Sequence, residues 1–212
     1  MRICVFCGSS PGNDSAYADA ARSVGQGLAE NDCELVYGGG RAGLMGVVAD
    51  AVLAAGGKVT GVIPRALVDQ EIAHAGLTQL LVVETMHERK AKMAELADGF
   101  IALPGGVGTL EEIFEQWGWA RLGIHQKPFG FLDVNGFFEP IRAMADQMAR
   151  AGFMRREHID IITFASDLEQ MLSAFRSYRA PSSRWFSPQV VGKSEALRGL
   201  RGLTIYPSHK SH

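Results

Sequence analysis

The segment at residues 100–112 reads Phe-Ile-Ala-Leu-Pro-Gly-Gly-Val-Gly-Thr-Leu-Glu-Glu and decides the fold of this chain. It joins a short, continuous apolar run to a glycine-rich turn and then to the start of an amphipathic helix. The same succession recurs along the sequence. Continuous apolar runs are typical of strands buried on both faces of a parallel sheet. Their alternation with helices predicts right-handed crossovers and hence an α/β fold, a doubly wound, Rossmann-like, mostly parallel sheet flanked by helices.

The chain of 212 residues suits a single domain of this class. We expect the domain to occupy residues 1–180, because the pattern of strands and helices stops near Pro181. Strands are expected at residues 3–6, 34–37, 58–63, 79–84, 100–103, 129–133 and 160–163. Helices are expected at residues 15–30, 44–55, 86–97, 109–122, 136–151 and 167–178. Residues 181–212 are basic overall, and we expect a mobile tail or an arm packed on a partner subunit, because sparse charges disfavour a nucleic-acid arm.

The composition excludes several classes of partner. The formal net charge is −2 and the pI is about 6.3, so no overall basic field attracts nucleic acid. No apolar run approaches the roughly 20 residues that a membrane-spanning helix needs. The apolar run at residues 3–7 is also shorter than the core of a secretory signal, about 7–15 residues. We therefore expect a cytoplasmic protein whose partner is a small molecule, with no nucleic acid and no membrane.

Cys4 and Cys7 have the spacing of redox and zinc motifs. Both fall within the apolar run at residues 3–7 that contains the first predicted strand, and in an extended strand residues three apart point to opposite faces of the sheet. We therefore expect separate, buried thiols rather than a disulfide or a shared metal. With Cys33 the number of cysteines is odd, and free thiols are typical of a reducing compartment.

Three predicted turns after strands are rich in glycine or small polar residues: 8–10, 38–40 and 104–109. In doubly wound sheets, ligands bind outside the carboxyl ends of the strands. The third turn leads into a helix, whose first N–H groups and dipole form an anion site suited to phosphate. Thr109 either caps this helix or donates its hydroxyl to a phosphate oxygen. Glu112 either completes a capping box with Thr109 or presents a carboxylate to the crevice, beside a core stripe that includes Phe114.

A second strand end leads into residues 86–90, Met-His-Glu-Arg-Lys. Met86, Arg89 and Lys90 share one helical face, while His87 points away from it. Arg89 offers a planar fork for a phosphate, ribose hydroxyls or a carboxylate. The alternative is a solvated basic pair on a surface helix.

Other nucleotide motifs are disfavoured. Residues 38–43 satisfy G-x-G-x-x-G, but they follow the second strand, and the next strand ends in Pro64 rather than an acidic residue, so NAD binding is not expected. No P-loop and no nucleophile elbow occur, and the histidines lack metal-ligand spacing. We expect neither a metal nor an organic cofactor.

The motif P-G-G-x-G-T-x-x-E at residues 104–112 resembles the signature of the LONELY GUY (LOG) family, the cytokinin riboside 5′-monophosphate phosphoribohydrolases long mislabelled as lysine decarboxylases. Further matching stretches lie at residues 4–10, 36–40, 43–46, 61–64, 86–90 and 122–125. The resemblance implies hydrolysis of the N-glycosidic bond of purine riboside 5′-monophosphates, including AMP and N6-prenylated AMP. It also implies a homodimer with active sites near the subunit interface.

The resemblance implies that Arg89 and Glu112 are the catalytic pair. The substrate-binding residues that we expect are Gly8, Ser9, Gly39, Gly40, Glu71, Met86, Arg89, Lys90, Gly105, Gly106, Val107, Gly108, Thr109 and Glu111. Gly118 departs from the plant relatives, which usually carry threonine there, so the contacts at the base end are in question. The main alternative is a non-catalytic carrier of a nucleotide or of molybdenum cofactor with the same fold. Against it, a crevice carboxylate would repel a merely retained anion. A lysine decarboxylase is disfavoured because no cofactor pocket with a Schiff-base lysine is evident.

Overall fold

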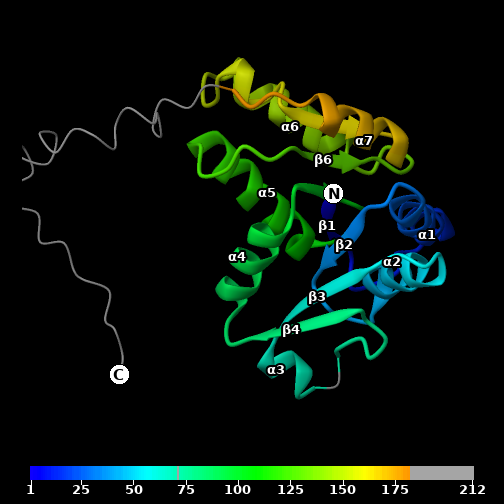
Figure 1. Ribbon diagram of the computed structural model, residues 1–212. Helices are drawn as coiled ribbons and strands as arrows, with labels where there is room; N and C mark the ends of the chain where they lie inside the picture. Colours follow the sequence, from blue (N-terminus) through cyan, green and yellow to red (C-terminus); the bar gives the residue numbers. More distant parts are fainter. Residues whose placement is uncertain (71, 182–212) are drawn as a thin grey trace, which may run out of the picture.

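The computed structural model describes residues 1–70 and 72–181, and these form one seven-stranded parallel sheet in the order β4-β3-β2-β1-β5-β6-β7 (Figure 1). The predicted fold class is therefore confirmed. The strands are β1 (Arg2–Phe6), β2 (Glu34–Tyr37), β3 (Val59–Pro64), β4 (Gln79–Val83), β5 (Gly99–Ala102), β6 (Phe129–Leu132) and β7 (Ile162–Ala165).

Helices cover both faces of this sheet, as Figure 1 shows. One face carries α1 (Ser15–Glu30), α2 (Gly43–Ala54) and α7 (Leu168–Ser177), and the opposite face carries α4 (Met86–Leu96), α5 (Val107–Leu122) and α6 (Glu139–Arg150). Each face has its own apolar core, and successive residues of β1 alternate between the two. Because the central strands are covered on both faces, their sequences are continuously apolar, whereas the edge strand β4 is only half-buried.

The cysteines behave as predicted. Cys7 packs in the core beneath α1 and α2, whereas Cys4 packs in the core beneath α4 and α5. Cys33 is buried as well, and all three thiols are free. The C-x-x-C spacing therefore forms neither a disulfide nor a common ligand set.

Several helix boundaries differ from the sequence prediction. The short helices α3 (Arg65–Val68) and η1 (Arg156–His158) were not expected. The helix α6 begins at Glu139 instead of residue 136, because Asn135 and Gly136 adopt left-handed conformations, with φ of 53° and 76°, in the turn that precedes it.

Two further expectations concern a membrane-spanning helix and the C-terminal tail. In the described ranges, no helix is long and apolar enough to span a bilayer. The tail predicted for residues 181–212 lies, apart from Pro181, outside the described residues.

Candidate active site

The glycine turns that follow β1 and β5 meet at the centre of the sheet. These strands are neighbours, with Phe6 paired to Ala102, so their carboxyl ends lie side by side. Gly8 donates its N–H to the carbonyl oxygen of Pro104 at 3.1 Å. A Cβ on Gly8 would lie 3.3 Å from the Cα of Gly105, and a Cβ on Gly105 would lie 2.7 Å from the nitrogen of Gly8. The two backbones therefore touch without intervening side chains, which requires glycine at both positions.

Helix α5 starts two residues earlier than predicted. Its N-cap is Gly106, which provides no side-chain cap, and Leu110 is the first residue of the helix whose N–H donates to a backbone carbonyl. Thr109 lies inside the first turn and is buried, so the alternative in which Thr109 and Glu112 form a capping box is wrong. The N–H groups at positions 107–109 have no intramolecular acceptor in the described structure. They are therefore available to an anion at the positive end of the helix dipole.

Arg89 and Glu112 face each other from α4 and α5. Nη1 of Arg89 donates to Oε1 of Glu112 at 2.8 Å, and the two side chains are only 10% and 12% exposed. Nε of Arg89 also donates to the carbonyl oxygen of Val62, at 3.1 Å. This second bond anchors the guanidinium to the end of β3, so its orientation toward Glu112 is fixed before any ligand arrives. The alternative of a solvated basic pair is wrong.

Gly38 makes room for this arginine. A Cβ at position 38 would overlap Nη2 of Arg89, so any side chain there would displace the guanidinium. The glycine tract after β2 is therefore explained in part by packing against the guanidinium of Arg89. The next residue, Gly39, has a φ of 75°, and its carbonyl oxygen accepts the N–H of His74. Gly40 forms an isolated bridge with Ala73.

The carboxyl of Glu112 has a raised pKa. Burial is the largest cause, because desolvation disfavours the charged form, while the positive charge of Arg89 opposes the shift. The pKa therefore moves from the ordinary value of glutamate toward neutrality. A carboxylate poised in this way accepts and returns a proton more readily at neutral pH than an exposed one.

Lys90 is buried and turns away from this pair. Its Nζ forms ion pairs with Glu111 and, at 3.0 Å, with Glu115, both on α5. The hydrogen bond that Lys90 donates to Glu111 is the main reason that the pKa of Lys90 is raised. Lys90 thus joins α4 to α5. On α4, His87 is exposed to solvent, as the sequence predicts.

A cavity of about 330 Å³ opens between α4 and α5, above the carboxyl end of β1. Ten of the expected site residues line it: Gly8, Ser9, Met86, Arg89, Gly106, Val107, Gly108, Thr109, Glu111 and Glu112. Gly105 lies in the adjoining turn, whereas Lys90, Gly39 and Gly40 do not line this cavity. Glu71 lies outside the described residues. The cavity is thus lined by a phosphate-type anion site at one end and by a buried carboxylate–guanidinium pair at the other.

Sequence reasoning missed Cys7 and Met45 as lining residues. Cys7 was assigned to the core, and it does belong to it, but the residue also lines the cavity. Burial raises the pKa of this thiol far above its usual value. Cys7 is therefore held as a neutral thiol and is not an activated nucleophile.

Comparison with known proteins agrees with the resemblance. A family model described as "Possible lysine decarboxylase" matches residues 45–175. The probable cytokinin riboside 5′-monophosphate phosphoribohydrolase LOGL1 of Oryza sativa subsp. japonica is 46% identical over 190 residues, which are 87% of this chain and 85% of that protein. LOG2 of Arabidopsis thaliana, named a cytokinin riboside 5′-monophosphate phosphoribohydrolase, is 45% identical over 95% of this chain and 94% of its own length.

The chain belongs to the LOG family. Solved structures share its fold at lower identity. The molybdenum cofactor binding protein of Rippkaea orientalis superimposes with a TM-score of 0.63 at 19% identity, covering 83% of this chain and 95% of that one. The Moco carrier protein of Chlamydomonas reinhardtii gives a TM-score of 0.61 at 18% identity, with the same coverage of both chains. At these identities the similarity supports a shared fold only, and the function has to be argued from the residues of the site. In the described part of this LOG protein, no cluster of three or more His, Cys, Asp or Glu side chains is arranged to hold a metal ion.

Proposed function

We propose that this protein hydrolyses the N-glycosidic bond of purine riboside 5′-monophosphates, including cytokinin nucleotides, and releases the free base and ribose 5-phosphate. The observation that carries the proposal is the buried contact between Arg89 and Glu112 beside the free N–H groups of α5. The names of the relatives that share nearly half of the sequence point to the same reaction.

The 5′-phosphate binds at the start of α5. The free N–H groups at positions 107–109 and the helix dipole offer a site for a phosphate dianion without any cationic side chain. Ser9, from the turn after β1, lines the same cavity and adds a hydroxyl donor. Binding at this remote group fixes the position of the ribose relative to Glu112.

Bond cleavage takes place at the anomeric carbon. The bond between this carbon and the ring nitrogen breaks with its electron pair going to the base, and positive charge develops on the ribose. The carboxylate of Glu112 stabilises this charge and accepts a proton from the water whose oxygen bonds to the anomeric carbon. The proton then passes to the departing base. Arg89 holds the carboxylate in place through the 2.8 Å hydrogen bond.

The base end of the cavity accepts both AMP and N6-prenylated AMP in our proposal. Met86 lines this cavity and is 47% exposed at its mouth, so an unbranched, adaptable apolar side chain faces the departing base. Gly118, on the following turns of α5, has no atom within 4 Å of a hypothetical Cβ, so space remains beside the helix.

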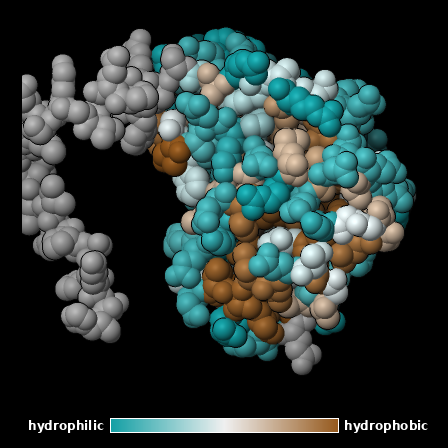
Figure 2. Space-filling view, viewed as in Figure 1, coloured by the Kyte–Doolittle hydropathy of each residue, from teal (hydrophilic) through white to brown (hydrophobic). Residues whose placement is uncertain are grey.

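We also propose a cytoplasmic homodimer. Apolar side chains gather over the edge strand β4 (Figure 2), where Val82 is 37% exposed and Leu80, Leu81 and Val83 are half-buried. An uncovered apolar strand at a sheet edge is typical of an interface between subunits. Met86 lies three residues after the end of this strand, so a partner subunit bound there would lie next to the cavity mouth. Three free thiols are consistent with a reducing compartment.

The deciding experiment is incubation of the purified protein with AMP or with N6-isopentenyl-AMP, followed by chromatographic detection of the free base and ribose 5-phosphate. We expect stoichiometric release of both products and a dimer by light scattering. A carrier would instead retain intact nucleotide. Retention of intact nucleotide would reject the proposal. We expect cleavage instead, because the buried carboxylate in the anion cavity favours catalysis over simple retention.

A further inference from the structure

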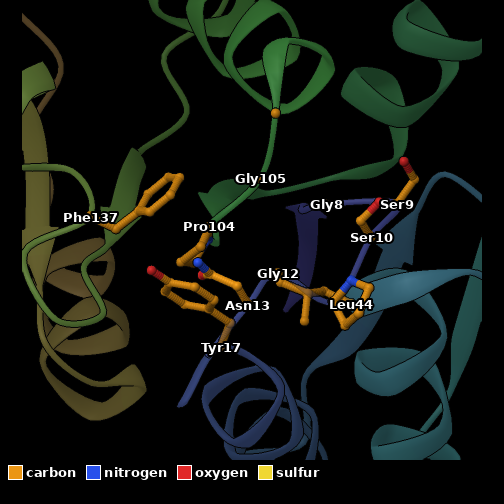
Figure 3. Close-up of a pocket in the computed structure, with 12 residues that line it drawn as sticks. Gly8, Ser9, Ser10, Gly12, Asn13, Tyr17, Leu44, Pro104, Gly105 and Phe137 are labelled. Carbon is orange, nitrogen blue, oxygen red and sulfur yellow. The ribbon is translucent and has the colours of Figure 1, made fainter. Parts of the chain in front are cut away.

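A second cavity, of about 320 Å³, lies on the other side of the paired glycine turns. It shares Gly8, Ser9 and Gly106 with the cavity of Arg89 and Glu112, so the turn expected to bind phosphate is a common wall. Figure 3 shows aromatic side chains at one end of this second cavity and two serines at the other. The remaining lining residues are Ser10, Pro11, Gly12, Asn13, Tyr17, Leu44, Pro104, Gly105 and Phe137.

The chemistry of this cavity differs from that of the first. No charged side chain lines it, and it contains no buried ion pair. The side chain of Asp14 already accepts the N–H of Ala16 at the start of α1, so this helix end is occupied by a carboxylate and disfavours an anion. The second cavity therefore suits an uncharged ligand.

Two aromatic rings form one end of it. Tyr17 of α1 and Phe137 from the loop before α6 meet edge to face, with ring centroids 5.7 Å apart at 74°. The two loops are tied together by a hydrogen bond of 3.3 Å from Nδ2 of Asn135 to Oδ2 of Asp14. Phe137 remains 37% exposed, although the ring of Phe138 packs against it. A partly exposed but well-positioned aromatic pair provides a surface on which a planar ring stacks.

The side-chain amide of Asn13 is suited to hydrogen bonding with the edge of such a ring. The amide of Asn13 lines the cavity beside Tyr17 (Figure 3), and it has no hydrogen-bond partner among the described residues. An asparagine amide offers one donor and one acceptor side by side, the pattern that matches the amino group and neighbouring ring nitrogen of adenine.

We infer that the second cavity binds an uncharged, planar heterocycle of purine size while the first cavity is occupied by a sugar phosphate. The observation behind this is the aromatic pair of Tyr17 and Phe137 next to the free amide of Asn13, across a shared turn from the anion site. This site goes beyond the proposed reaction and does not depend on it. Because both cavities share one wall, any effect of a ligand in one cavity on affinity in the other must be reciprocal and of the same factor.

The test is calorimetric titration of the full chain with adenine, in the presence of saturating ribose 5-phosphate. We expect adenine to bind the wild type under these conditions, because the two ligands occupy different cavities. Asn13→Ala is expected to weaken adenine binding about five- to tenfold, as a lost pair of neutral hydrogen bonds predicts. Phe137→Leu is expected to weaken it by a similar factor. The matched control is Phe153→Leu, since Phe153 is also an exposed phenylalanine, 84% exposed, and lines neither cavity.

A comparison of ligands adds a second readout. Unsubstituted purine lacks the amino group, so it should bind the wild type more weakly than adenine, and Asn13→Ala should remove this difference. The inference is overturned if ribose 5-phosphate excludes adenine, or if Asn13→Ala and Phe137→Leu bind adenine as tightly as Phe153→Leu does. Release of adenine from AMP, assayed on the same samples, reports separately on the proposed reaction, so the two failures are distinguishable.

Discussion

Gly38 leaves free the space that the guanidinium of Arg89 occupies: a Cβ at position 38 would overlap Nη2 and lie 3.0 Å from Cζ of that arginine. Gly38→Ala therefore has to displace Arg89 and break its contact with Glu112. We expect kcat for AMP to fall by about 10²–10³, the usual cost of one misplaced electrostatic group. The rest of the surroundings tolerate alanine, because the next neighbour is the adaptable side chain of Met45, at 3.5 Å. The displaced, buried guanidinium should also lower the thermal transition, so the kinetics are measured on folded protein below that transition, and activity near the wild-type level would contradict this reading.

The carboxylate of Glu112 is the acid–base group in our proposal. Glu112→Gln should lower kcat for AMP by about 10²–10³, because the amide neither stabilises positive charge nor accepts a proton. The matched control is Glu111→Gln, one residue away on α5, whose side chain is 53% exposed and pairs with Lys90. The control should retain far more activity than Glu112→Gln. Equal losses in the two variants, measured by steady-state kinetics on folded protein, would remove Glu112 from the mechanism.

The pH dependence follows from the same carboxyl. Its folded pKa is raised by burial, so the active, ionised form is lost as the pH falls at a higher pH than for an ordinary glutamate, whose pKa is about 4.3. Because the positive charge of Arg89 lowers this pKa, Arg89→Gln should move the acidic limb of the kcat profile further toward neutral pH. The residual activity of that variant provides the measurement. An acidic limb that stays in place would show that another group titrates.

Lys90 is expected to stabilise the fold rather than to bind substrate. Lys90→Met leaves Glu115 without its ion pair, although the other oxygen of that carboxylate is already buried without a partner. We expect a loss of about 1–3 kcal/mol in the free energy of unfolding, with little change in KM for AMP. Lys92→Met is the control, because Lys92 forms only an exposed pair with Glu95 on the same helix. A large rise in KM without destabilisation would place Lys90 at the nucleotide.

Gly118 lies in the interior of α5, and a Cβ there would meet no atom within 4 Å. Gly118→Ala should raise the free energy of unfolding by about 0.5–1 kcal/mol, because alanine loses less conformational entropy in a helix. Denaturant unfolding checks this value. A destabilised variant would indicate that position 118 packs against something, such as a partner subunit.

The sheet could be predicted from sequence because each strand is a continuous apolar run and every crossover except that from β3 to β4 carries a helical pattern. Local patterns were less informative about the start of α5. Thr109 has the spacing of a capping box, but Gly106 already occupies the N-cap position, so the helix begins before Thr109. Phe114 was expected in the core and is 36% exposed, because the buried stripe runs through Thr109, Ile113 and Gln116 instead.

The site was predictable only in part. The Arg89–Glu112 contact joins residues 23 apart on different helices, so helical spacing left the role of Glu112 open, and only the family resemblance paired them. Neither Tyr17 nor Phe137 belongs to a recognisable motif. They are 120 positions apart, and their contact follows from the neighbouring positions of β1, β5 and β6 in the sheet.

The central position of β1 has a consequence for biosynthesis. The backbone N–H of Arg2 donates to the carboxylate of Asp98, 96 residues later, just where β5 begins alongside β1. One edge of β1 therefore stays unpaired until the 96 residues that separate Arg2 from Asp98 have been synthesised. Such long-range pairing slows folding and leaves an apolar strand edge exposed to aggregation of the nascent chain. The need for chaperones during translation should therefore depend on how long β1 waits for β5 to be synthesised.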